Sequence, residues 1–232
     1  IYAFSGLPPE PDIDPKVAEK AQLLEFSKDM QNYFQQENHY NDWHDAFYDL
    51  ANCTSEGKVI ILLDEITWMA SGSSSMLGKL KNSWDKWFKQ NNQLIFILCG
   101  SVSTWIKHKI INSTGFYGRI SIKLNLKPLP LYACKDFRGE RSKLMCDKEK
   151  IKILAVTGGI PKYLEEINPS LTAEENIRRL CFNESGILFN DFYHIFSAML
   201  EKKSHYYRNI AMILSVKNLE QTELLKTLDV NS

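Results

Sequence analysis

The sequence lacks three features that would each indicate a broad class of protein. It has no net charge, because 28 Lys and Arg residues balance 28 Asp and Glu residues, so nothing global favours nucleic acid or an anionic membrane as a partner. It has no apolar run near the roughly 18 residues that a membrane span requires. Its five cysteines show no CxxC pair and no metal-ligand spacing, which is typical of reduced thiols in a cytoplasmic protein. What remains is the ordinary composition of a globular chain of 232 residues, which suits one large domain or two small ones.

The stretch Lys58–Glu65 organises the chain. Its apolar residues run without interruption from Val59 to Leu63 and end in two adjacent acids, Asp64 and Glu65. An unbroken apolar run predicts a strand that is buried on both faces of a parallel sheet. Open sheets of this kind bind ligands at the carboxyl ends of their strands, where solvent, a metal or a cation can meet the two acids. The same run would equally well form a buried strand that ends in polar residues and binds no ligand.

A second uninterrupted apolar run, Leu94–Leu98, predicts a second central strand. It is followed by Cys99, Gly100 and Ser101, and glycine allows the backbone to turn tightly at this point. Because the carboxyl ends of parallel strands meet at one edge of a sheet, we expect Ser101 to lie near the two acids. There its hydroxyl group would reach a phosphate or an attacking water, although a Gly-Ser turn after a strand is weakly specific.

Arg119 closes a glycine-bounded loop just before a further predicted strand, Ile120–Leu126. An arginine at the end of a sheet can neutralise phosphate charge in a transition state. A solvated loop arginine, or one paired with a carboxylate, would show the same pattern.

The flanking regions contain a short strand and many helices. Helix periodicity and capping residues predict two helices before the central strand and several short helices after Leu131. The last helix and turn resemble the first half of a helix-turn-helix. These predicted elements are a strand at Ile1–Phe4, helices from about Pro15 and about Asp42, helices at Trp105–Ile111, Lys148–Val156 and Tyr206–Leu214, a helix that begins at the Thr172 capping box, a helix carrying Leu188 to Met199, and the final segment Leu219–Asn231.

Four motifs in a fixed order resemble the archaeal and bacterial ATPase group of the AAA+ and STAND-type P-loop NTPases. They are the strand that ends in Asp64 and Glu65, the strand before Cys99-Gly100-Ser101, the loop Ser113–Ile120, and Thr157–Leu164. The resemblance implies an α/β fold, with a three-layer P-loop NTPase core built on a parallel five-stranded sheet in residues 1–130 that is incomplete at its N-terminus. It further implies an α-helical lid at 131–203 and the beginning of a winged-helix domain at 204–232.

The resemblance also implies roles for individual residues. Asp64 would hold Mg²⁺ through a water molecule, and Glu65 would be the general base that orients the attacking water. Ser101 would be the sensor on the neighbouring strand, and Arg119 an arginine finger or phosphate sensor. Gly159 and Pro161 match the lid motif that packs near the adenine of bound ATP.

One departure from the family is severe, because the phosphate-binding motif G-x-x-x-x-G-K-[ST] does not occur in the sequence. In the family it follows a central first strand, so we interpret the chain as a piece of a longer Mg²⁺-dependent ATPase, inactive by itself. The alternatives are a pseudo-ATPase or a scaffold that binds DNA or a protein partner through its C-terminal helices, and, less well supported, a metal-dependent nuclease. We expect a cytoplasmic protein that has no membrane partner and that can form homo-oligomers.

Overall fold

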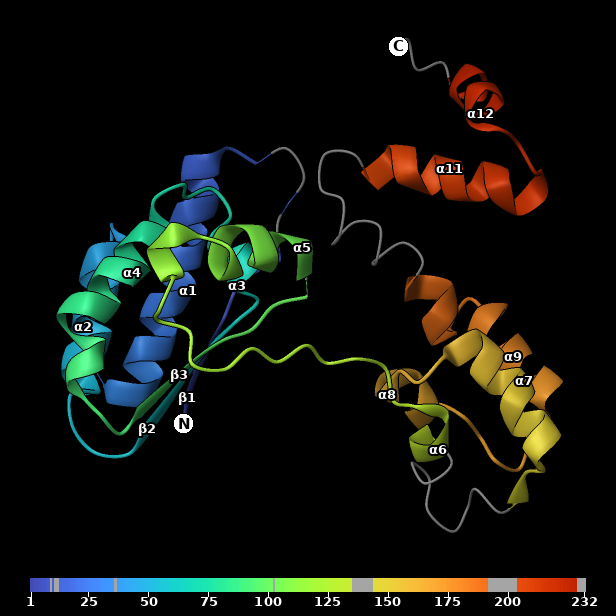
Figure 1. Cartoon of the computed structure of the whole chain (residues 1–232), viewed down its shortest axis with the longest axis horizontal. Helices are drawn as coiled ribbons and strands as arrows, with labels where there is room; N and C mark the ends of the chain where they lie inside the picture. Colours follow the sequence, from blue (N-terminus) through green and yellow to red (C-terminus); the bar gives the residue numbers. More distant parts are fainter. Residues whose placement is uncertain are drawn as a thin grey trace. The chain divides into compact units, whose positions relative to one another are not determined.

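The computed structural model describes residues 1–8, 10, 13–35, 37–101, 103–134, 144–191 and 204–228. The chain divides into two compact units, Ile1–Lys123 and Leu124–Ser232, and each is described by itself (Figure 1). The candidate site residues Asp64, Glu65, Ser101 and Arg119 belong to the first unit.

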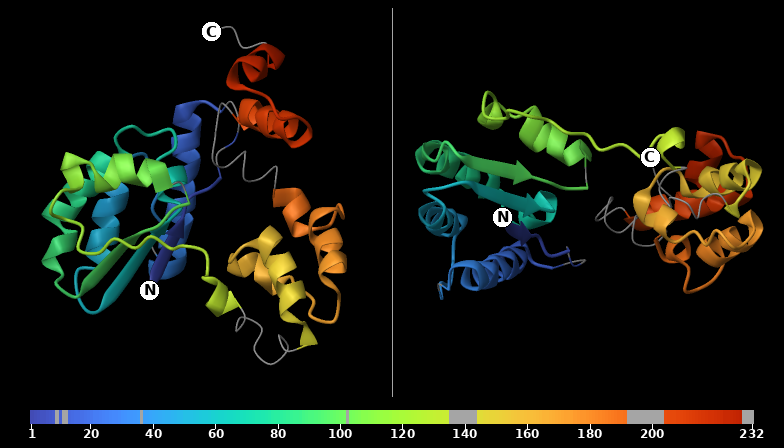
Figure 2. Two further views of the ribbon diagram at one scale, coloured as in Figure 1. Left: turned by 45° about the vertical axis from the view of Figure 1, so that its right-hand side comes forward. Right: turned by 90° about the horizontal axis from the view of Figure 1, so that it is seen from below.

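The first unit is built on a parallel sheet of three strands. They are β1 (Tyr2–Ser5), β2 (Val59–Asp64) and β3 (Leu94–Leu98), and their order in the sheet is β1-β2-β3. The register pairs Ser5 with Asp64, and Leu63 with Leu98, so all three strands end at one edge, as the arrowheads in Figure 2 show. The predicted parallel sheet is therefore confirmed, with strands at three of the predicted places in the chain.

The helices of the first unit begin where the sequence provides caps. Asp14 accepts a hydrogen bond from the main-chain N–H of Lys16, and Asp42 does the same for His44, so each carboxylate satisfies a donor that the first helical turn leaves free. The helical elements of this unit are α1 (Pro15–Phe34), α2 (Trp43–Cys53), α3 (Ile66–Met69), α4 (Met76–Lys86), η1 (Phe88–Gln90), α5 (Ser103–Ile106), η2 (Lys107–Ile111) and η3 (Thr114–Phe116).

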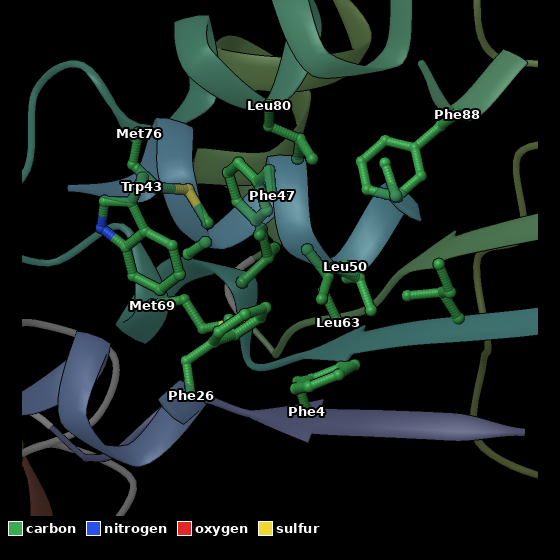
Figure 3. Packing of buried hydrophobic residues seen from close by; sticks show 14 of the residues in the cluster. Phe4, Phe26, Trp43, Phe47, Leu50, Leu63, Met69, Met76, Leu80 and Phe88 are labelled. Atoms are coloured by element: carbon green, nitrogen blue, oxygen red, sulfur yellow. The ribbon is translucent and has the colours of Figure 1, made fainter. Parts of the chain in front are cut away.

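Helices α1, α2 and α4 cover one face of the sheet and form the main core with it (Figure 3). Phe4 and Leu63 point from the strands into this core, where the ring of Phe4 stacks on that of Phe26 with 4.5 Å between centroids. Trp43 and Phe47 of α2 are fully buried and stack on each other at 5.3 Å. Aromatic packing of this kind holds the sheet and helices together and so fixes the position of the sheet edge.

The other face of the sheet differs from the prediction that the two apolar strands are buried on both sides. Ile61 and Leu63 are fully buried, whereas Ile60 and Leu62 are only half-buried. On β3, Ile95 and Ile97 are 55% and 41% exposed. Among the described residues β3 pairs with β2 alone, so it is an edge strand rather than the central strand that the sequence predicted.

The predicted strand at Ile120–Leu126 is also wrong, so the described part of the sheet has three strands. Residues 120–130 are in neither helix nor strand, and the side chains of Ile122, Leu124 and Leu126 are 74%, 83% and 91% exposed. The alternation of apolar and polar residues is typical of a strand, but a strand also needs an edge with which to pair. In the described part of the chain nothing pairs with this segment.

The second unit contains the predicted run of short helices. Thr172 and Glu175 form the predicted capping box, and a small apolar cluster forms around Met145, Ile153 and Ala173. Of the predicted helix from Leu188 to Met199, residues 187–191 are helical and 192–199 lie outside the described residues, as do 229–231 of the last predicted segment. The elements are α6 (Leu131–Cys134), α7 (Asp147–Thr157), α8 (Pro161–Glu165), α9 (Ala173–Cys181), α11 (Ser204–Val216) and α12 (Gln221–Thr227).

Within the described ranges no helix has the length and apolar character that a membrane crossing needs.

Candidate functional site

Asp64 is the last residue of β2, at the carboxyl edge of the sheet. Its main-chain oxygen accepts a hydrogen bond from the N–H of Gly6 at 3.1 Å, which extends the pairing of β1 with β2 by one step. Its carboxylate Oδ1 accepts the N–H of Glu65 at 2.9 Å. The side chain is therefore held close to the backbone. The place of Asp64 at the end of a strand is the one that the sequence predicted.

Glu65 adopts a left-handed backbone conformation, with φ 48° and ψ 47°. For a residue other than glycine this conformation costs about 1–2 kcal/mol. The carbonyl oxygen of Glu65 accepts the N–H groups of Trp68 and Met69, at 2.8 and 3.0 Å, so the residue makes the turn from β2 into α3. Backbone strain of this kind persists where the surroundings impose it and is concentrated at functional sites.

Ser101 lies beside Glu65, as predicted. Its Oγ donates a hydrogen bond to Oε2 of Glu65 at 3.2 Å, although 36 residues separate the two in sequence. The strand β3 brings the segment Cys99–Ser101 to this edge, and the carbonyl oxygen of Cys99 accepts the N–H of Ile66 at 2.9 Å. The ends of two neighbouring strands thus fix both partners of the hydrogen bond.

Cys99 is a member of the site to which the sequence analysis gave no role. Burial raises the pKa of its thiol, and a hydrogen bond to the Asp64 carboxylate and the negative charges of Asp64 and Glu65 act in the same direction. The thiol is therefore a neutral donor beside the acids at neutral pH. The available signal was its place directly after the Leu94–Leu98 strand, next to Ser101.

The donor set at this edge suits Mg²⁺ only as part of a larger site. Asp64 and Glu65 provide carboxylate oxygens, which Mg²⁺ prefers, but Mg²⁺ is usually held by one or two carboxylates together with substrate phosphates and water. Across the described ranges no group of three or more His, Cys, Asp or Glu residues could hold a metal ion. The edge therefore fits a cation that arrives with a phosphate ligand better than a metal held by protein alone.

The structure places Arg119 in an ion pair. Its Nε and Nη2 donate to the two carboxylate oxygens of Asp85, both at 2.8 Å, and Nη1 donates to the carbonyl oxygen of Tyr117. Asp85 lies in the last turn of α4, which leads through η1 to the beginning of β3. The ion pair therefore holds Arg119 against α4, and the hydrogen bonds of its guanidinium group go to Asp85 and Tyr117 rather than to Asp64, Glu65 or Ser101.

The stability contributed by this ion pair should depend on pH. The hydrogen bonds from Arg119 and Lys81 hold the pKa of Asp85 well below its usual value of 3.8. A carboxyl group with a depressed folded-state pKa contributes stability above its unfolded pKa, and that stability is lost as the pH falls through the folded pKa. We therefore expect Asp85→Asn to melt at a lower temperature than the wild type at pH 7, by an increment that shrinks below about pH 4. Calorimetry at several pH values measures this increment, and one that does not vary with pH would contradict the prediction.

Gly159 and Pro161 lie in the second unit, where both have structural roles. The carbonyl oxygen of Gly159 accepts the N–H of Leu129 at 2.7 Å, and a side chain on Gly159 would overlap the backbone of Leu129. Pro161 opens α8 at its first position, where the absent N–H costs no hydrogen bond. The predicted turn is confirmed, and its role near an adenine stays a prediction.

Comparisons with protein-family models, with curated proteins and with solved structures found no match to this chain. The functional argument therefore rests on the geometry at the carboxyl edge of the sheet.

Proposed function

We propose that this chain supplies the metal-holding and water-activating residues of a Mg²⁺-dependent ATP hydrolase of the AAA+ and STAND type. The observation that carries the proposal is the position of Glu65. Its carboxylate lies at the end of the middle strand, next to Asp64, and accepts a hydrogen bond from Ser101 of the neighbouring strand at 3.2 Å. Parallel α/β sheets bind their ligands at this edge.

In this proposal each side chain has a distinct task. Asp64 would help to hold Mg²⁺, and the ion would neutralise charge on the phosphates. Glu65 accepts the proton of the attacking water, for which a carboxylate must lie within hydrogen-bond reach of that water. Ser101 restricts the rotation of the Glu65 side chain by donating to one of its two oxygens. The hydroxyl thereby orients the base and leaves its second oxygen for the water.

The proposal also requires a phosphate-binding loop that this sequence does not contain. Hydrolysis in P-loop enzymes depends on main-chain amides and a lysine that hold the phosphates, and no G-x-x-x-x-G-K-[ST] occurs among the 232 residues. In an active enzyme most of the binding energy for the nucleotide would therefore come from further groups. The cation that the nucleotide carries would still meet Asp64 and Glu65 of this chain, with low affinity, when Mn²⁺ and ATP are present in large excess.

A test on this chain is to locate a bound divalent cation by its effect on amide resonances. We expect Mn²⁺ added with ATP to broaden the amide signals around Asp64, Glu65 and Ser101 in an ¹⁵N-labelled sample, because Mn²⁺ occupies Mg²⁺ sites built from oxygen donors. Asp64→Asn should remove this localised broadening. Glu56→Gln is the matched control and should keep it, since Glu56 is an exposed acid before the first residue of β2. Broadening that is absent, or that survives in Asp64→Asn, would refute the proposal.

A second candidate is a scaffold that binds a partner but does not hydrolyse ATP. The observation in its favour is the engagement of Arg119 with Asp85, since an arginine in a bidentate ion pair is not free to contact a phosphate. If the chain is such a scaffold, Mn²⁺ added with ATP would not broaden the amide signals of Asp64, Glu65 and Ser101.

A further inference from the structure

Gln22 is a polar residue in the middle of the core-facing side of α1. It is only 5% exposed, between Ala18 and Phe26, each one helical turn away. Its Nε2 donates to the carbonyl oxygen of Leu7, and its Oε1 accepts the N–H of Leu7, both at 2.9 Å. A buried amide that forms both hydrogen bonds with one main-chain residue fixes that residue in position. Gln22 thus ties the loop after β1 to α1.

The residue before Leu7 lies directly against the turn that carries Glu65. The main-chain N–H of Gly6 donates to the carbonyl oxygen of Asp64 at 3.1 Å. A Cβ atom on Gly6 would lie 2.7 Å from both the carbonyl oxygen of Glu65 and the N–H nitrogen of Met69. Atoms this close leave no room for a side chain. The loop held by Gln22 therefore packs against the backbone of the strained residue.

We propose that Gln22 is a positioning residue for Glu65. By holding Leu7, and with it Gly6, against the carbonyl group of Glu65, the buried amide keeps this backbone in the left-handed conformation that points its carboxylate at Ser101. That Glu65 is the base rests on the proposed function, whereas the mechanical link from Gln22 to the backbone of Glu65 does not. A merely structural glutamine would stabilise the loop without affecting φ at Glu65.

Strain provides a thermodynamic test of this link. If Gln22 holds Glu65 in a costly conformation, Gln22→Met loses two hydrogen bonds but lets the strain relax, and the relaxation offsets part of the loss. In a Glu65→Gly background there is no strain to relax, because glycine adopts positive φ freely. We therefore expect Gln22→Met to raise the unfolding equilibrium constant about fivefold more in Glu65→Gly than in the wild type.

The double-mutant cycle is measured by urea unfolding followed by tryptophan fluorescence. All five tryptophans, at positions 43, 68, 84, 87 and 105, lie in the first unit, so the signal reports that unit alone. Effects of Gln22→Met that are equal in the two backgrounds would overturn the proposal. Ser27→Ala is the matched control, since Ser27 is equally buried on α1 and donates within the helix to Leu23. It should be additive with Glu65→Gly.

A spectroscopic measurement separates this inference from the proposed function. The three-bond coupling between the amide and α protons of Glu65 reports its φ angle. We expect the coupling to change in Gln22→Met and to stay unchanged in Ser27→Ala. An unchanged coupling in Gln22→Met would refute the positioning role even if Mn²⁺ binds at Asp64. A changed coupling without Mn²⁺ binding would support the link and refute the ATPase proposal.

Discussion

Replacing Phe26 by alanine should lower the free energy of unfolding of the first unit by about 3–5 kcal/mol. The side chain is 2% exposed, and it contacts the sheet and the second helix at the same time. Its ring stacks on Phe4 of β1 at 4.5 Å and meets Trp43 and Phe47 of α2 edge to face at 5.6 and 6.1 Å. Because all three partner rings are held by their own elements, the surrounding structure cannot close the space that the Phe26 ring leaves. The cavity therefore adds to the free energy lost with the burial of the ring.

The measurement is urea unfolding of the wild type and the variant, followed by tryptophan fluorescence. Leu24→Ala is the control, since Leu24 belongs to the same helix but is 52% exposed, and its loss should change stability by less than about 1 kcal/mol. If Phe26→Ala and Leu24→Ala had similar effects, the aromatic cluster would not be the main source of stability in this unit.

Gly72→Ala should destabilise the first unit by about 2–4 kcal/mol, through two separate costs. Gly72 has φ +80°, which alanine adopts only with strain. An added Cβ would overlap the carbonyl oxygen of Pro15 and lie 3.1 Å from the Cβ of Ala18. The loop between α3 and α4 thus packs directly on the first turns of α1, where only a hydrogen atom fits.

Gly78→Ala is a control that should change stability in the opposite direction. Gly78 lies within α4, and an added Cβ would have no atom within 4 Å. Alanine is favoured over glycine by up to about 1 kcal/mol in a helix, and less in the first turn, where Gly78 lies, so this variant should be slightly more stable than the wild type. Urea unfolding of the two variants compares the two changes directly, and a stabilising Gly72→Ala would contradict the packing described here.

In the first unit, sequence patterns correctly predicted the helix starts and strands that depend on residues close together in the sequence. Helices were predicted from about Pro15 and from about Asp42, and both begin there in the structure, capped by Asp14 and Asp42. Such starts are predictable because capping depends only on neighbouring residues. The runs Val59–Leu63 and Leu94–Leu98 are strands, as predicted. These runs could not indicate whether one face of the sheet or both faces are buried. Burial of a face depends on helices and loops from elsewhere in the chain.

The same distinction applies to the site. Asp64, Glu65 and Ser101 were predicted to meet because parallel strands end at one edge, and they do. Arg119 was expected to serve that edge, but it precedes the extended segment and pairs with α4 through Asp85. Its partner is 34 residues away in sequence, and no local pattern identifies such a pair.

Gln22 had a weak signal that the sequence analysis did not use. It is a polar residue one helical turn from Ala18 and from Phe26, on the buried face of α1. A buried polar side chain requires a partner, so its position predicts a hydrogen bond to some other element. Only the structure shows that the partner is Leu7, and that the loop held in this way touches Glu65.

In the part of the chain that the structure describes, one edge of β3 is unpaired, and this has a consequence for handling the protein. The strand Leu94–Leu98 contains no charged residue, proline or glycine, and its Ile95 and Ile97 side chains are exposed. Exposed edges in soluble proteins are usually protected by charges, prolines or bulges against pairing with another chain. We therefore expect the isolated chain to precipitate as its concentration rises, and a lysine at position 95 or 97 to improve its solubility.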